Sequence, residues 1–282
     1  MRSIPMSRTE GGFSLIELLV TITLVSSVLA SAGGLLVTSR RSIDREIIRV
    51  EATQALRAVL DTLARDLRLG GACLPMNGDF VALSGNDAGV ADSIVTRHGL
   101  VRLDLTCVRT ALRTELLQAG SELAVDSADG FAPDMWVYIR HPNGTGEFFS
   151  ITDAQAAVRT LHKSTTLSKD YPIGSGVYAV DQREYATDTA DPTFPTLTIA
   201  SNGAPPIPFA FGVEELDIQY QLARNCPACD VVDIPVTNAE WALVTEIDVG
   251  VTVRSRVADA EGQYFRRSGR IKAKPRNLLP PG

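Results

Sequence analysis

The hydrophobic pattern along the chain begins with one long apolar run near the N-terminus. Residues 18–39 contain no charged side chain, and at 1.5 Å per residue they span about 33 Å as a helix, enough to cross a hydrocarbon core. Arg2 and Arg8 precede the run and Arg40-Arg41 follow it, so the distribution of positive charge does not settle its orientation. The pattern predicts a membrane-spanning helix.

The next stretch is amphipathic. Apolar side chains recur at three- and four-residue steps, at Leu56, Val59, Leu60, Leu63 and Leu67. Charged residues occupy the other positions, where we expect them to face water: Arg57, Asp61, Arg65, Asp66 and Arg68. Gly70-Gly71 is a helix stop signal, so one helix of about 85 Å is predicted from Phe13 to Leu69. Gly33-Gly34 lies midway and is a candidate position for a kink or local unwinding.

Beyond residue 75 short alternating runs replace the helical period, with turn residues between them. Strands are predicted at Leu100–Cys107, Met135–Arg140, Glu147–Thr152, Val177–Val180, Leu216–Leu222, Ile247–Arg254 and Gln263–Lys272. The last two flank Ala258–Gly262 and predict a hairpin. The predicted fold class is α+β, a long N-terminal helix packed on a mainly antiparallel sheet.

Composition adds few constraints. Hydrophobic residues make up 45% of the chain and charged residues 21%, as in a folded globular protein, and the net charge of −6 implies no general affinity for polyanions. Basic residues nevertheless gather near the C-terminus, at Arg254, Arg256, Arg266, Arg267, Arg270, Lys272, Lys274 and Arg276. Arginines at alternate positions of a hairpin favour a solvated or edge-protecting face over a DNA-binding surface, so nucleic acid is not an expected partner.

Enzyme chemistry is not indicated. The three histidines, His98, His141 and His162, are scattered without metal-ligand spacing. The sequence contains no nucleophile-elbow motif, since Gly174-Ser175-Gly176 does not match it, and it contains no phosphate-loop or dinucleotide motif. We therefore predict no catalytic residue, no metal site and no cofactor. Asn143-Gly144-Thr145 matches a glycosylation sequon, but Asn-Gly is also a strong turn signal, and we interpret it as a turn.

The opening of the apolar run, GGFSLIELLV, carries a carboxylate at Glu17. If the segment is a plain signal anchor, Glu17 has no evident function. A secretory signal peptide cut before Gly33 has a suitable site in Ala30-Ser31-Ala32, but its apolar run is longer than usual and contains Glu17. A carboxylate in the bilayer core costs about 2.5–3.5 kcal/mol or more and therefore needs a partner.

The segment GGFSLIELLVTITLV resembles the class III signal of type IV prepilins and pseudopilins. The resemblance implies that a prepilin peptidase cuts after Gly12 and that the new first residue, Phe13, is N-methylated. It also places Glu17 at mature position five, where the carboxylate neutralises the N-terminal amine of a neighbouring subunit. Glu17 would then serve assembly.

Four further stretches resemble minor pilins of the PilW type: Val59–Pro75, Gly212–Leu222, Trp241–Arg256 and Phe265–Leu279. The resemblance implies a subunit that initiates type IV pilus assembly and lies near the pilus tip. It implies as partners the other minor pilins, the major pilin, a PilY-type adhesin, the prepilin peptidase and the inner-membrane assembly platform. A minor pseudopilin (J-type) of type II secretion is the alternative, and a membrane-anchored periplasmic enzyme is less favoured.

The same resemblance divides the chain into a leader (1–12), a membrane and filament-core helix (13–39), an amphipathic stalk (40–69) and a β-rich head (70–282) with an insertion at 110–190. It implies a single pass through the bacterial inner membrane with the head in the periplasm, and a place in the cell-surface pilus after assembly.

The four cysteines belong to the predicted head. In an oxidising compartment they most simply form two disulfides, and spacing favours Cys73–Cys107 and Cys226–Cys229 over the crossed alternatives. A four-cysteine zinc site and a thioredoxin-like Cys-Pro-Ala-Cys pair are the other interpretations. The redox motif requires a helix after the second cysteine, and Asp230–Pro235 does not have a helical pattern.

Overall fold

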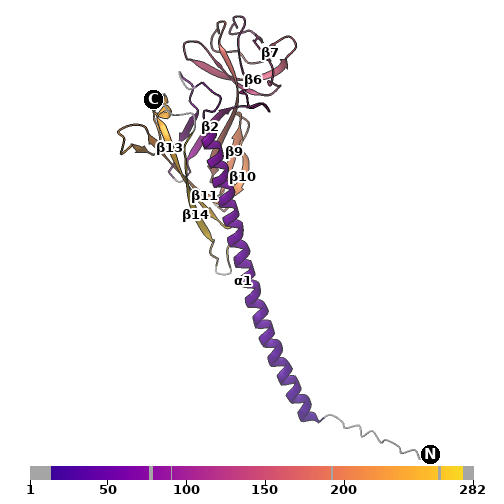
Figure 1. Cartoon of the computed structure of the whole chain (residues 1–282). Coiled ribbons are helices and arrows are strands. Elements are labelled where there is room, and N and C mark those ends of the chain that lie inside the picture. Colours follow the sequence, from indigo (N-terminus) through magenta and orange to yellow (C-terminus); the bar gives the residue numbers. More distant parts are fainter. Residues whose placement is uncertain (1–13, 76–78, 90, 192, 260–261, 276–282) are drawn as a thin grey trace, which may run out of the picture.

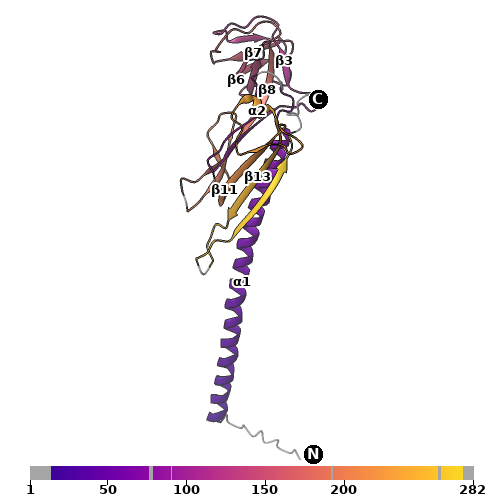
Figure 2. The same ribbon diagram turned by 90° about the vertical axis from the view of Figure 1, so that its left-hand side faces the viewer.

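A computed structural model of the protein describes residues 14–75, 79–89, 91–191, 193–259 and 262–275. It begins with the long helix α1 (Leu15–Leu69), whose N-terminal half projects from a β-rich head (Figures 1 and 2). The helix passes through Gly33 and Gly34 without interruption, so the described residues show no local unwinding there. It ends where Gly70-Gly71 predicted, with Gly70 as its C-cap and Gly71 at a φ of 79° that suits glycine.

The head consists of strands and one short helix. The first half contains β1 (Leu83–Asn86), β2 (Ser93–Gly99), β3 (Arg109–Ala111), β4 (Glu122–Ala124), β5 (Trp136–Arg140), β6 (Gly146–Gln155) and β7 (Thr160–Lys163). The second half contains β8 (Gly176–Asp188), β9 (Thr196–Ser201), β10 (Ile207–Phe211), β11 (Val213–Leu222), β12 (Val231–Val232), α2 (Asn238–Ala242), β13 (Val244–Arg254) and β14 (Arg266–Ala273).

The strands form two antiparallel sheets. The larger sheet has the order β1-β2-β8-β5-β6-β7-β4, with β3 and the β9–β10 pair joined to β8. The smaller sheet has the order β12-β11-β13-β14. The C-terminal half of α1 lies between the smaller sheet and strands β2 and β10 of the larger one (Figure 1). This arrangement confirms the predicted fold class, a long N-terminal helix packed on antiparallel sheets.

The leucine stripe of α1 enters the main core as predicted. Leu56, Val59, Leu63 and Leu67 are buried against residues of both sheets. From the smaller sheet, the alternating residues Ile247, Val249, Val251 and Val253 of β13 point inward and are buried. Burying one such side chain contributes about 1.5–3 kcal/mol, so this interface fixes the helix to the head.

A second core lies at the end of the head farthest from the N-terminus, around β5, β6 and β7 (Figure 1). Strand β8 joins the two cores, because Val177 and Ala179 belong to the distal one and Val180 and Tyr185 to the main one. The buried residues of the distal core lie between positions 108 and 179. That residues 110–190 are an insertion into the head stays a prediction.

One predicted strand is wrong. Residues 100–107 form a loop closed by an isolated bridge between Val101 and Cys107. The side chain of Asp104 accepts hydrogen bonds from the backbone N–H and the hydroxyl of Thr106, which bends the chain into a turn. The hairpin predicted around Ala258–Gly262 is confirmed, since β13 pairs with β14 from Ile247↔Ala273 to Arg254↔Arg266.

Candidate functional site: the exposed helix and its junction with the head

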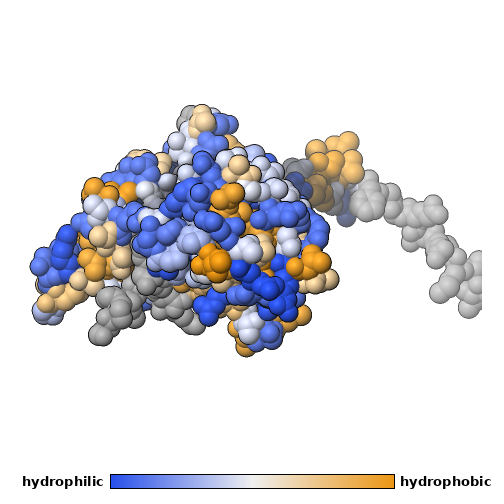
Figure 3. Space-filling model, turned by 90° about the horizontal axis from the view of Figure 1, so that it is seen from above, coloured by the Kyte–Doolittle hydropathy of each residue, from blue (hydrophilic) through white to orange (hydrophobic). Residues whose placement is uncertain are grey.

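The N-terminal half of α1 exposes an apolar surface that the head does not cover. Its large apolar side chains, among them Leu15, Leu19, Leu24, Leu29 and Leu36, are more than half exposed. The helix is long and apolar enough to cross a membrane. Seen from the opposite end, the head is mostly hydrophilic, with small separate apolar patches (Figure 3). An apolar surface as large as that of the helix marks a membrane or protein contact.

Five hydroxyl groups on this half of the helix are satisfied within the helix itself. Thr21, Thr23 and Ser27 each donate to a backbone carbonyl three residues earlier at 2.8 Å. Ser31 and Thr38 donate to carbonyls four residues earlier at 2.8 and 2.9 Å. These polar groups therefore need no water, and the segment is compatible with an apolar environment.

Glu17 differs from those hydroxyls. It lies in the first turn of α1, where the helix dipole favours a carboxylate, but among the residues that the structure describes no side chain pairs with it. In lipid or in a bundle of apolar helices, the carboxylate would need a positive group from another molecule or a proton. Gly12 and Phe13, the predicted cleavage and methylation positions, lie outside the described residues.

A buried ion-pair network anchors the other end of the helix. Asp66 is 1% exposed, and its carboxylate accepts hydrogen bonds from Arg183 at 2.8 Å and from the Tyr185 hydroxyl at 2.5 Å, both on β8. The Thr96 hydroxyl on β2 donates to the backbone carbonyl of Asp66 at 3.2 Å. The prediction that Asp66 faces water is therefore wrong, because this carboxylate joins the helix to the larger sheet.

The network continues outward along the sheet. Arg183 also pairs with Asp181 at 3.0 Å, and His98 on β2 lies 3.5 Å from the same carboxylate. Burial raises the pKa of Tyr185 above its ordinary value, and the hydrogen bond to Asp66 raises it further. For Arg183, burial lowers the pKa, but the charges of Asp66 and Asp181 outweigh it and raise the pKa overall. Tyr185 therefore stays a neutral donor and Arg183 a cation at all physiological pH values.

Both cysteine pairs form disulfides in the structure. Cys73, just beyond the helix, is joined to Cys107 across 34 residues of sequence, and Cys226 is joined to Cys229. The first bond ties the end of α1 to the loop that follows β2. The loop of the second is also held by Arg224, which pairs with Asp230 at 2.6 Å and with Glu240 at 3.1 Å.

We expect the two disulfides to contribute unequally to stability. Replacing Cys73 and Cys107 together by serine should lower the free energy of unfolding by about 3–4 kcal/mol, because a long loop of the unfolded chain is released. The matched Cys226→Ser/Cys229→Ser variant should lose much less, because its loop is short and keeps the Arg224 ion pairs. Urea unfolding of the full chain in detergent measures both. Equal losses, or non-reducing peptide maps with crossed pairs, would reject this assignment.

The basic side chains of β14 pair with carboxylates on the other strands of the smaller sheet, β11 and β13. Arg266 pairs with Glu214 at 2.7 Å, Lys272 pairs with Glu246 at 2.8 Å, and Arg270 pairs with Asp217. These contacts cross the smaller sheet on the face opposite α1. A polyanion would have to compete with these carboxylates, so the cluster acts first as a cross-strand ladder of charges.

The residues considered for enzyme chemistry lie apart. His98 is on β2, His141 follows β5 and His162 is on β7, and no cluster of metal-ligating side chains occurs within the described ranges. Ser175 is fully buried and donates to the Pro172 carbonyl at 2.7 Å, which is a structural role. Asn143 and Gly144 form the turn between β5 and β6, where the Asn143 side chain accepts from the Thr145 N–H at 3.0 Å.

Comparisons with known proteins agree with the N-terminal features. Residues 7–33 match the prokaryotic N-terminal methylation motif. No curated protein matches the chain significantly. Among solved structures, a type IV-like pilin from Thermus thermophilus is similar, with 10% identity over 81% of this chain and 98% of its own, at a TM-score of 0.37. The chain thus carries a prokaryotic N-terminal methylation motif at the start of a long helix whose C-terminal half packs on antiparallel sheets.

Proposed function

We propose that this chain is a minor type IV pilin of the PilW type, which helps to initiate pilus assembly and lies at or near the pilus tip. The observation that carries the proposal is the projecting apolar helix, whose start holds the methylation motif and Glu17, a carboxylate that pairs with no side chain among the described residues. Cleavage after Gly12 would create an N-terminal amine at Phe13. That amine would be the partner that Glu17 of an adjacent subunit requires.

The head supports a structural role in a filament. A tensile force on the helix would be carried by the Asp66–Arg183 pair and the Cys73–Cys107 bond, because these connect the helix end to different parts of the head. Before assembly the protein would be anchored in the inner membrane with its head in the periplasm. Other minor pilins, the major pilin and the assembly platform would contact the helix, and a PilY-type adhesin would bind the tip complex.

Copurification of the full chain from its own cells tests this assignment. We expect crosslinked complexes to contain other prepilin-type subunits together with a PilY-type adhesin. Recovery with secretion-system subunits instead would assign the chain as a minor pseudopilin of type II secretion, which uses the same helix and the same assembly chemistry. Recovery without any prepilin-type subunit would contradict both assignments.

A further inference from the structure

We propose that the Cys226–Cys229 disulfide is a thiol–disulfide exchange site, at which the folded head accepts two electrons from a protein dithiol of the thioredoxin class. The Cys73–Cys107 disulfide stays closed under the same conditions. The two bonds differ in access, in the length of the loop that each closes and in the contacts around them. The exchange needs no assembled pilus, so its test stands apart from that of the proposed function.

The Cys226–Cys229 bond is open to an attacking thiol. Cys226 is exposed, Pro227 and Ala228 beside it are exposed as well, and Cys229 is half-buried. Exchange begins when a thiolate reaches one sulfur of the disulfide, so its rate depends on access to that sulfur. Cys226, the exposed partner, is therefore the point of attack, and Cys229 is the leaving group.

The Cys73–Cys107 bond lies against the backbone at the end of α1. Both cysteines are half-buried. Gly99 on β2 comes so close that a β-carbon there would lie 2.7 Å from the β-carbon of Cys73, and the Gly99 N–H donates to the Ala72 carbonyl at 2.7 Å. Strand β2 therefore covers Cys73 on one side, and a thiol has less access to this disulfide.

The loop that contains Cys226 and Cys229 is also closed by contacts other than the disulfide. The Asp230 N–H donates to the Arg224 carbonyl at 3.0 Å, and the Asp230 carboxylate accepts from the Asn225 side chain at 3.0 Å. The cysteines are only 3 positions apart in the sequence, so their bond removes little entropy from the unfolded chain. Reduction therefore leaves this loop and the rest of the head folded.

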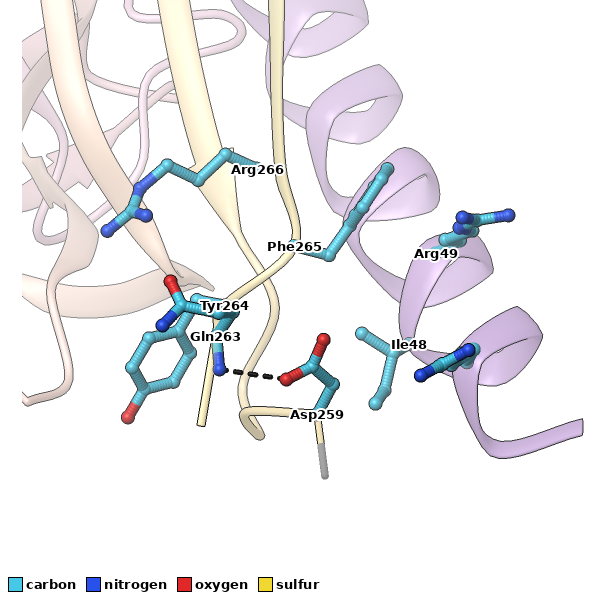
Figure 4. A pocket seen from close by; sticks show the side chains of 8 residues that line it. Ile48, Arg49, Asp259, Gln263, Tyr264, Phe265 and Arg266 are labelled. Atoms are coloured by element: carbon cyan, nitrogen blue, oxygen red, sulfur yellow. Dashed lines mark hydrogen bonds between the residues drawn. The ribbon is translucent and has the colours of Figure 1, made fainter. Parts of the chain in front are cut away.

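The packing of the head on α1 lies elsewhere and does not depend on this loop. Figure 4 shows Phe265, just before β14, extending toward the helix, and the Arg49 guanidinium lies 5.8 Å from the centre of its ring. Further along β14, Gly269 lets the strand approach the helix so closely that a β-carbon there would lie 2.8 Å from Leu60 Cδ1. Opening the loop at 226–229 therefore leaves the helix–head contact in place.

The exchange proceeds in two steps with a dithiol donor. A thiolate of the donor attacks the Cys226 sulfur, the bond between the two cysteines breaks, and its electron pair leaves on Cys229, which takes up a proton. The second thiolate of the donor then attacks the donor sulfur of this mixed disulfide and releases Cys226, which is protonated in turn. The head gains two electrons and two protons, and the donor, which loses them, leaves as a disulfide.

The surroundings of the pair make it the acceptor of electrons and not the attacking thiol. An attacking cysteine of the thioredoxin type lies at a helix N-terminus or beside a cation that stabilises its thiolate. Here the next helix, α2, begins only at Asn238, and the Arg224 guanidinium is shared by Asp230 and Glu240. The head therefore receives electrons at this site and does not pass them on as a redox enzyme would.

Reduced thioredoxin, regenerated by its reductase and NADPH, is the probe for this exchange. The full chain in detergent is incubated with it, samples are alkylated with iodoacetamide at intervals, and each cysteine is followed by peptide mass spectrometry. We expect Cys226 and Cys229 to be alkylated roughly tenfold faster than Cys73 and Cys107. Tryptophan fluorescence should stay unchanged during this phase, because Trp241 is buried in the main core, which stays folded.

The Cys226→Ser/Cys229→Ser variant is the matched control. The native chain should consume one equivalent of NADPH in a fast phase, because one disulfide takes two electrons, and the control should lack that phase. A thioredoxin variant without its second cysteine should be trapped on Cys226, and trapping on Cys229 would contradict the assigned point of attack. Equal rates of alkylation at the two disulfides, or loss of the native fluorescence as Cys226 and Cys229 react, would overturn the proposal.

Discussion

Replacing Glu17 with alanine is expected to remove the chain from assembled complexes while leaving its head folded and its helix inserted. The substitution removes a charge from the anchor, so insertion becomes no harder. The amine of the neighbouring subunit, however, loses its counter-charge in an apolar environment. At about 2.5–3.5 kcal/mol for an unpaired charge, association should weaken roughly a hundredfold.

The measurement is recovery of the variant in crosslinked complexes relative to its amount in the membrane. Glu46→Ala is the matched control, because Glu46 is a carboxylate on the same helix that is exposed and only loosely paired with Arg49 at 3.9 Å. This control should assemble normally. If Glu17→Ala assembled as well as Glu46→Ala, Glu17 would have no role in assembly.

Replacing Asp66 with alanine is expected to destabilise the head more than any other single charge removal from α1. The substitution leaves Arg183 without its main partner and takes the acceptor from the Tyr185 hydroxyl. Breaking a buried pair costs about 3–5 kcal/mol, and because the Arg183 side chain is 32% exposed and can reach water, we expect about 3 kcal/mol.

Urea unfolding of the full chain in detergent, followed by tryptophan fluorescence, measures this loss. Asp61→Ala is the control on the same helix, because Asp61 is exposed, and it should change stability by less than about 0.5 kcal/mol. Asp66→Asn should fall between the two, since the amide keeps an acceptor for Tyr185 but loses the charge. A loss for Asp66→Ala no larger than that of Asp61→Ala would refute the anchoring role.

Features with a regular period could be predicted from the sequence. In the leucine stripe of α1 and in the alternating segment Ile247–Arg254, apolar residues recur on one face of the element. The structure buries these apolar faces as expected. Glu17 was singled out because a carboxylate inside an apolar run requires an explanation, and its role in assembly stays a prediction. In all these cases the information lies within a few residues of sequence.

The helix–head junction could not be predicted in the same way. Asp66 is buried against Arg183, which lies 117 residues away in the sequence. Local periodicity could not reveal this pair, so it assigned Asp66 to the solvent face. The only signal was its place beside Leu67, whose position on the apolar stripe brings this turn of the helix against the sheet. The predicted strand at Leu100–Cys107 failed for a local reason, because Asp104 competes for the backbone and forms a turn.

The mature N-terminus is the most direct test of the proposal that the chain is a processed prepilin-type subunit. The full chain is extracted from membranes of its own cells and its N-terminal peptide is identified by mass spectrometry. We expect residues 1–12 to be absent and the first residue to be N-methylated Phe13. A mature chain beginning at Gly33 would show conventional signal-peptide cleavage, and a chain that keeps residues 1–12 would show a plain anchor. Either result would contradict processing by a prepilin peptidase.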